Sequence, residues 1–185
     1  MEVNLTWDLF VIVFFVVILS YSFVIGKDGT VKLLLSSYMS LIAADALGNL
    51  LSKFFFTSEP IIKLFSLSQD PTALVITKIS IFIIAMVTFA VKGAYEITMP
   101  KENATAEFFL TLLFGSLSAV FLISGILVFT SGGSLIAGGV AITESNISAM
   151  YNQSYIVRTI VLNYSLWFAL PMLAFLIFSL FRKSE

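Results

Sequence analysis

Residues 32–56 read KLLLSSYMSLIAADALGNLLSKFFF. The rest of the chain is expected to be organised around this stretch, because it carries a carboxylate, Asp45, well inside an apolar run. Read as a helix turning by about 100° per residue, it has two marked faces. One face gathers small residues, namely Ser36, Ser37, Ser40, Ala43, Ala44 and Gly48. Small side chains let a second transmembrane helix approach closely, so this face predicts a packing surface.

The other marked face of residues 32–56 is polar. It carries Tyr38, Asp45, Asn49 and Ser52. A carboxylate near the middle of a membrane costs at least about 2.5–3.5 kcal/mol unless it is paired, protonated or hydrated, so we expect Asp45 to point into a helix bundle, a cavity or a partner. No basic residue lies within one turn of Asp45 on this face, and the nearest polar groups are Asn49 and Tyr38. Two interpretations stay open: a proton, cation or partner site, and a capped or hydrated structural carboxylate.

The composition of the whole chain indicates an integral membrane protein. Of its 185 residues, 59% are hydrophobic and 11% are charged, whereas soluble domains carry about 25% charged residues. The net charge is −1 and no basic run is present, so nucleic acid is not an expected partner. The chain has no cysteine and no histidine, which excludes disulfides, thiol nucleophiles and imidazole bases. We therefore expect no metal, no cofactor and no enzymatic activity.

The apolar runs predict an all-α, polytopic membrane bundle that forms a single domain over residues 1–185. A span needs about 20 apolar residues, and the predicted spans are residues 9–25, 33–54, 73–91, 108–130 and 160–181. A turn at residues 26–29 (GKDG) separates the first two spans, and residues 57–71 predict a short interfacial helix. The alternative has four spans, because Asp45 and Asn49 lower the hydropathy of the second run.

Features of the later part of the chain refine this prediction. A second small-residue face in residues 108–130 carries Gly115, Ser118, Ala119 and Gly125, and we expect it to pack against the first. Lys78, inside the third run, is expected to snorkel to the nearer interface. Residues 131–158 are too rich in glycine and polar residues to span, so they predict a functional loop with a short re-entrant or interfacial piece. The last span should kink near Pro171.

The distribution of basic residues predicts the orientation of the chain. With the N-terminus outside, the cytoplasmic segments would hold Lys27, Lys32, Lys92, Lys101, Arg182 and Lys183, and the external segments Lys53, Lys63 and Arg158. Cytoplasmic loops carry the excess of Lys and Arg, so this count favours an external N-terminus and a cytoplasmic C-terminus.

The order of motifs resembles the colicin V production protein family of small bacterial inner-membrane proteins. The resemblance rests on Asp8 just ahead of an apolar helix, the turn at residues 26–29, the Ser- and Ala-rich residues 36–44, and residues 112–127 (LLFGSLSAVFLISGIL) after a charged connector. Some basic residues usual in that family are missing, and a fifth helix follows a long polar loop. The resemblance implies a role in toxin production and secretion or in envelope homeostasis.

These observations predict a non-enzymatic accessory protein of the bacterial cytoplasmic membrane. Its expected partners are the lipid bilayer and either other membrane proteins or further copies of the chain. The alternative is a small channel or a proton-coupled transporter subunit that uses Asp45.

Overall fold

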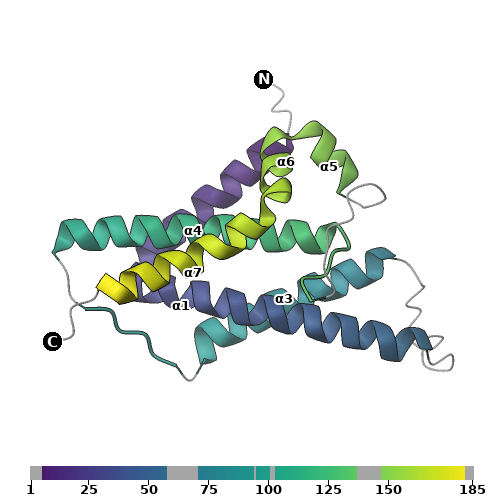
Figure 1. Cartoon of the computed structure of the whole chain (residues 1–185), viewed down its shortest axis with the longest axis horizontal. Helices are drawn as coiled ribbons and strands as arrows, with labels where there is room; N and C mark the ends of the chain where they lie inside the picture. Colours follow the sequence, from purple (N-terminus) through teal and green to yellow (C-terminus); the bar gives the residue numbers. More distant parts are fainter. Residues whose placement is uncertain (1–5, 58–70, 94, 101–102, 137–146, 182–185) are drawn as a thin grey trace. The chain divides into compact units, whose positions relative to one another are not determined.

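Helices are the only regular secondary structure in the part of the chain that the structure describes. A computed structural model describes residues 6–57, 71–93, 95–100, 103–136 and 147–181, and these contain no strand. Figure 1 shows the helices α1 (Trp7–Thr57), α3 (Pro71–Lys92), α4 (Ala104–Thr130), α5 (Ser148–Gln153), α6 (Tyr155–Leu162) and α7 (Tyr164–Phe181). The all-α prediction is confirmed. The predicted interfacial helix falls almost entirely outside the described residues.

Several of these helices have the length and apolar character of membrane spans. Three helices qualify singly: α1, α3 and α4. The pair α6 and α7 also qualifies when its two parts are taken together, although they are bent by 69°. Long apolar helices of this kind are typical of membrane proteins.

Helix α1 contains a sharp break at Gly26. Gly26 has φ of 73° and ψ of −179°, in a region that residues with a Cβ rarely adopt. The Thr30 hydroxyl donates to the carbonyls of Ser22 and Gly26, at 3.1 Å and 2.7 Å, and so links the part of α1 after the break to the backbone at and before it. The predicted four-residue turn is wrong in its length, because residues 27–29 are already helical. One glycine is sufficient to interrupt the helix.

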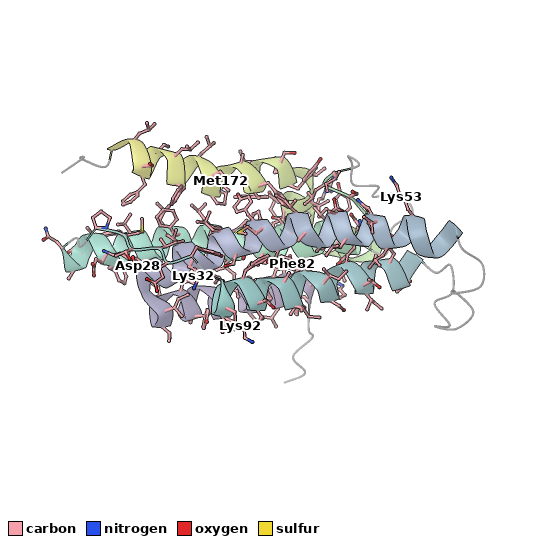
Figure 2. The ribbon with its side chains drawn as sticks, turned by 90° about the horizontal axis from the view of Figure 1, so that it is seen from below. Asp28, Lys32, Lys53, Phe82, Lys92 and Met172 are labelled. Atoms are coloured by element: carbon pink, nitrogen blue, oxygen red, sulfur yellow. The ribbon has the colours of Figure 1, made fainter. Side chains whose placement is uncertain are left out.

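The chain divides into two compact units, each with its own core. The first comprises Met1–Leu34, Ile97–Ser124 and Met150–Glu185, and the second comprises Leu35–Glu96 and Gly125–Ala149. In the first unit, Phe121 lies edge-on to Phe168 with ring centroids 5.0 Å apart. In the second, Phe82 meets Phe129 edge-on at 6.1 Å. Figure 2 shows Phe82 among the packed side chains of its unit, whereas Lys53 and Lys92 extend away from the ribbon.

The small residues expected at packing surfaces are buried, and three of the glycines lie close to side chains of other helices. Ser36, Ser40, Ala44, Ser118 and Ala119 have no exposed surface. A Cβ at Gly48 would lie 2.5 Å from Cγ of Lys78 in α3, and one at Gly115 would lie 2.9 Å from Cβ of Ser22. Only Gly125 faces the second part of α1, where Leu41 lies 2.7 Å from an added Cβ. The packing of the face with Ser40, Ala44 and Gly48 against the face with Gly115 and Ala119 stays a prediction, because small residues favour close approach without selecting which helix approaches.

The last apolar run bends at Asn163, not at Pro171. Helix α7 continues through Pro171. At Asn163 the side-chain amide donates to the Thr159 carbonyl at 2.9 Å and the backbone N–H donates to the same oxygen at 3.3 Å. Both bonds satisfy a carbonyl at the end of α6, which therefore terminates there. The predicted kink at Pro171 is wrong.

Gly115→Leu should destabilise the protein, because Gly115 lies against Leu19 and Ser22 within one unit. We expect a loss of about 1–3 kcal/mol, the usual cost of overpacking a close contact. Thermal unfolding in detergent measures the loss, with Ala169→Leu at an exposed position as the matched control. Equal melting temperatures for the two variants would contradict the packing described for Gly115.

Candidate functional site

The strongest candidate for a functional site is a buried ion pair in the second unit. Asp45 of α1 has no exposed surface and Lys78 of α3 is 2% exposed. The Lys78 Nζ donates to the Asp45 Oδ1 at 2.7 Å, a short, charge-assisted contact. The attraction between the two charges offsets the free-energy cost of removing each of them from water into an apolar interior. The pair therefore joins α1 to α3.

The second oxygen of Asp45 is bonded by the segment that follows α4. The Ser134 hydroxyl and the Ile136 N–H both donate to Asp45 Oδ2, each at 2.9 Å. Asn49 is one turn along α1, and its amide donates to the Ser134 hydroxyl at 2.9 Å. The Asn49 amide lies 3.5 Å from Asp45 Oδ1, which is too long for a strong bond. Both carboxylate oxygens are thus engaged by fixed donors.

The segment reaches Asp45 because α4 ends in a glycine cap. Gly132 has φ of 73°, its N–H donates to the Phe129 carbonyl at 2.9 Å, and the Gly133 N–H donates to the Val128 carbonyl at 3.1 Å. This pattern is a Schellman motif, in which a left-handed residue stops the helix and redirects the chain. The glycines at 132 and 133, expected from the sequence to provide a flexible loop, instead set a defined turn.

Lys78 is held along its whole length. Its stem passes Gly48, where an added Cβ would come within 2.5 Å of Cγ and 3.0 Å of Cε. Its Nζ lies 5.9 Å from the Phe129 ring centroid and 3.4 Å from the Gly133 carbonyl oxygen. A carbonyl at the end of α4 and an aromatic face both favour a cation. Gly48 is therefore the residue that leaves room for the buried lysine.

The structure brings only some of the predicted polar residues into the site. Asp45 and Asn49 belong to it, and Tyr38 lies half-buried on α1 two turns earlier. Ser52 lies in α1, and its side chain is outside the described part. The sequence-based reasoning missed Lys78 and Ser134. The prediction that Lys78 snorkels to an interface is wrong, because it is buried against Asp45.

A signal for Lys78 was present in the sequence. Three charged residues lie inside the predicted apolar spans: Asp45, Lys53 and Lys78. Lys53 stands at the end of its span, whereas Asp45 and Lys78 lie further inside and have opposite signs. Charges within spans usually pair with one another, so the two could have been matched on that ground. Ser134 and the Ile136 N–H carry no comparable signal, since their positions depend on the turn at Gly132.

The first unit contains two further polar clusters, and both are structural in form. Asp8 Oδ1 accepts hydrogen bonds from the Ser154 hydroxyl at 2.5 Å and the Ile156 N–H at 3.2 Å, at the start of α6. A carboxylate is favourable at a helix N-terminus. Near the break in α1, the Lys27 Nζ contacts Glu107 Oε1 and the Pro100 carbonyl, each at 2.6 Å. These contacts tie together chain segments that are distant in sequence.

The contacts around Asp45 hold its charged carboxylate in place and do not present it as a reactive group. Among the described residues, no cluster of three His, Cys, Asp or Glu side chains could hold a metal ion. The donors to Asp45 come from two separate parts of the chain: Lys78 of α3, and the Ser134 hydroxyl and Ile136 N–H of the segment after α4. A carboxylate with both oxygens bonded in this way holds these parts of the chain together.

Comparisons with known proteins provide no relative from which a role could be transferred. No family model matches the chain, and neither a curated protein nor a solved structure matches it significantly.

A double-mutant cycle tests whether the buried pair is coupled. Asp45→Asn and Lys78→Met should each lower the free energy of unfolding by about 3–5 kcal/mol, because each leaves one buried charge unpaired. The double variant should lose clearly less than the sum of the two losses. Denaturant unfolding in detergent provides the measurement.

A cycle on Lys27 and Glu107 is the control for the buried pair. The Glu107 side chain is 42% exposed, so water stabilises its charge when the partner is lost. We expect the coupling energy of the Lys27→Met and Glu107→Gln cycle to be no more than about 1 kcal/mol. Strict additivity at Asp45 and Lys78 would contradict the pairing.

Proposed function

We propose that this protein is a non-enzymatic, polytopic protein of a bacterial cytoplasmic membrane that acts as an accessory in secretion or envelope homeostasis. Support for the role comes from the motif resemblance to colicin V production proteins, carried by Asp8, residues 26–29, 36–44 and 112–127. Support for the membrane location comes from the long apolar helices. The accessory role needs a stable helical scaffold and no reactive centre.

One observation favours an accessory protein over a transporter: both carboxylate oxygens of Asp45 are engaged by donors of the protein. A carboxylate that relays protons must release its partners and meet water or a mobile acceptor during each cycle. Asp45 is instead held by a lysine, a hydroxyl and a backbone N–H, and it has no exposed surface. This arrangement favours a structural clamp over a transport site. The alternative remains the small channel or proton-coupled subunit, in which Lys78 would separate from Asp45.

We further propose five membrane spans with the N-terminus outside and the C-terminus in the cytoplasm. The break at Gly26 supports dividing α1 into two spans, and the bent pair of α6 and α7 would form the fifth. The excess of Lys and Arg in the segments assigned to the cytoplasm supports the orientation.

Reporter fusions test this topology directly. Fusions after Lys101 and after Glu185 should both report the cytoplasm, and a fusion before Trp7 should report the outer side. If α1 crossed the membrane only once, the chain would have one span fewer. Every later fusion would then lie on the side of the membrane opposite to the predicted one, for the same position of the N-terminus. An external signal at either Lys101 or Glu185 would therefore overturn the five-span arrangement.

Flux measurements separate the accessory class from the transporter class. Purified protein in liposomes should conduct neither protons nor alkali cations above the rate of empty liposomes, because the charges at Asp45 and Lys78 are mutually bound. Flux that Asp45→Asn abolishes and Glu107→Gln leaves intact would contradict the accessory role. Recovery of a stoichiometric partner after mild solubilisation of native membranes is the expected positive result.

A further inference from the structure

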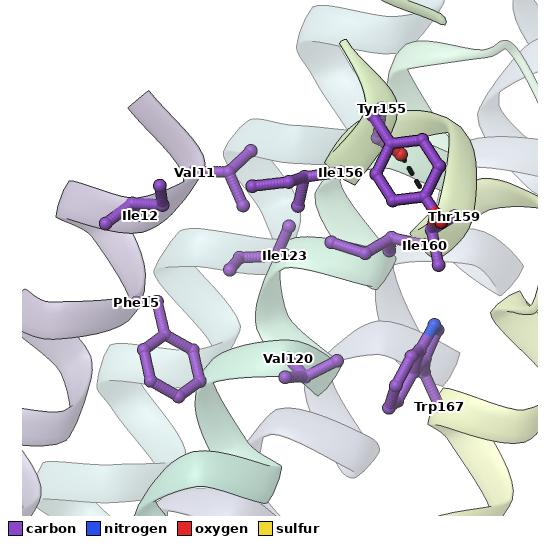
Figure 3. A pocket seen from close by; sticks show the side chains of 10 residues that line it. All are labelled: Val11, Ile12, Phe15, Val120, Ile123, Tyr155, Ile156, Thr159, Ile160 and Trp167. Carbon is purple, nitrogen blue, oxygen red and sulfur yellow. Dashed lines mark hydrogen bonds between the residues drawn. The ribbon is translucent and has the colours of Figure 1, made fainter. Parts of the chain in front are cut away.

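An apolar groove lies within the first unit, between the first part of α1, α4 and the bent pair of α6 and α7. Its cavity volume is about 310 Å³. Figure 3 shows Phe15 of α1, Val120 and Ile123 of α4, Ile160 of α6 and Trp167 of α7 around it. All of these helices are parts of apolar candidate spans. The groove therefore belongs to the part of the unit that would adjoin lipid.

The accessible surface that lines the groove is wholly apolar. The Thr159 hydroxyl donates to the Tyr155 carbonyl at 2.9 Å, which occupies its proton within α6, as the dashed line in Figure 3 marks. The indole Nε1 of Trp167 is buried and has no hydrogen-bond partner among the described residues. An occupant that fits this wall is a hydrocarbon chain.

The flank of the groove on α6 has a different character. Tyr155, which lines the groove, is 80% exposed. Arg158, the one basic residue of α6, is exposed and lies three residues further along the helix, so that it neighbours Tyr155 on the helix surface without lining the groove. The Arg158 guanidinium lies 5.6 Å from the Tyr151 ring centroid, so an aromatic ring supports it from one side. The neighbouring carboxylate, Asp8, is already bonded by Ser154 and the Ile156 N–H. Arg158 is thus available to a phosphate, which guanidinium groups bind well.

We propose that this groove binds one acyl chain of a membrane phospholipid, whose phosphate is held by Arg158. The acyl chain contributes the hydrophobic part of the binding free energy, which grows with each methylene removed from water. Arg158 contributes preference for an anionic headgroup. The inference rests on the membrane location proposed above but not on the accessory role, and the reporter fusions test that location separately.

Tryptophan quenching tests the proposal because Trp167 lines the groove and the only other tryptophan is Trp7. The full chain carrying Trp7→Phe is reconstituted in phosphatidylethanolamine vesicles with increasing brominated phosphatidylglycerol. The reference carries Trp7→Phe, Trp167→Phe and Leu166→Trp, which places the indole at a 52% exposed site on α7. Quenching of Trp167 should saturate at a far lower brominated fraction than quenching of the reference.

Three variants sharpen the test. Val120→Phe fills the groove and should weaken selective quenching of Trp167 roughly tenfold, as expected when about two methylenes lose their buried place. Val17→Phe makes the same change at a 57% exposed position of α1 and should have no effect. Arg158→Gln should remove the preference for phosphatidylglycerol over phosphatidylethanolamine while leaving the protein folded.

Three results would each overturn the proposal. Quenching of Trp167 that follows the bulk brominated fraction, as in the reference, means that no lipid is selected. Equal behaviour of Val120→Phe and Val17→Phe means that the groove is not the site. Absence of quenching at every brominated fraction means that another protein surface, such as a second copy of the chain, covers Trp167.

Discussion

A charge buried in an apolar interior must be compensated, and in this protein the compensation of Asp45 by Lys78 constrains the whole second unit. Removing either charge from water alone would cost several kcal/mol. At 2.7 Å, the ammonium of Lys78 supplies the missing interaction, and Ser134 and the Ile136 N–H supply the remaining bonds. The relative positions of α1, α3 and the end of α4 within this unit follow from that requirement.

Two glycines near the ion pair allow Lys78 and Ser134 to reach Asp45. Gly48 lacks a side chain where the Lys78 stem passes, so the lysine can lie buried along α1. Gly132 adopts a left-handed conformation that ends α4 and turns Ser134 toward Asp45. Neither glycine binds Asp45 itself. Both act through geometry, one by leaving space and the other by redirecting the chain.

The sequence predicts the local features of this protein far better than its long-range contacts. Apolar runs locate the helices, and the polar character of Asp45 within such a run marks it as a site that needs a partner. The partner is 33 residues away on another helix, and a single sequence contains the two charges but not their contact. The bend at Asn163 was missed for a related reason. Pro171 has the stronger helix-breaking tendency, yet α7 continues through it, whereas the Asn163 side chain caps α6.

The measurement that tests the central claim most directly is the dipolar coupling between ¹⁵N-labelled Lys Nζ and ¹³C-labelled Asp Cγ, recorded by solid-state NMR in lipid vesicles. Lys78 and Asp45 form a Lys–Asp ion pair, and the Lys78→Met variant assigns the coupling to it. We predict a strong coupling, as a 2.7 Å contact between Nζ and Oδ1 requires, that disappears in Lys78→Met. A spectrum without that coupling would contradict the account, because Lys78 would then extend toward an interface and leave Asp45 without its charge partner.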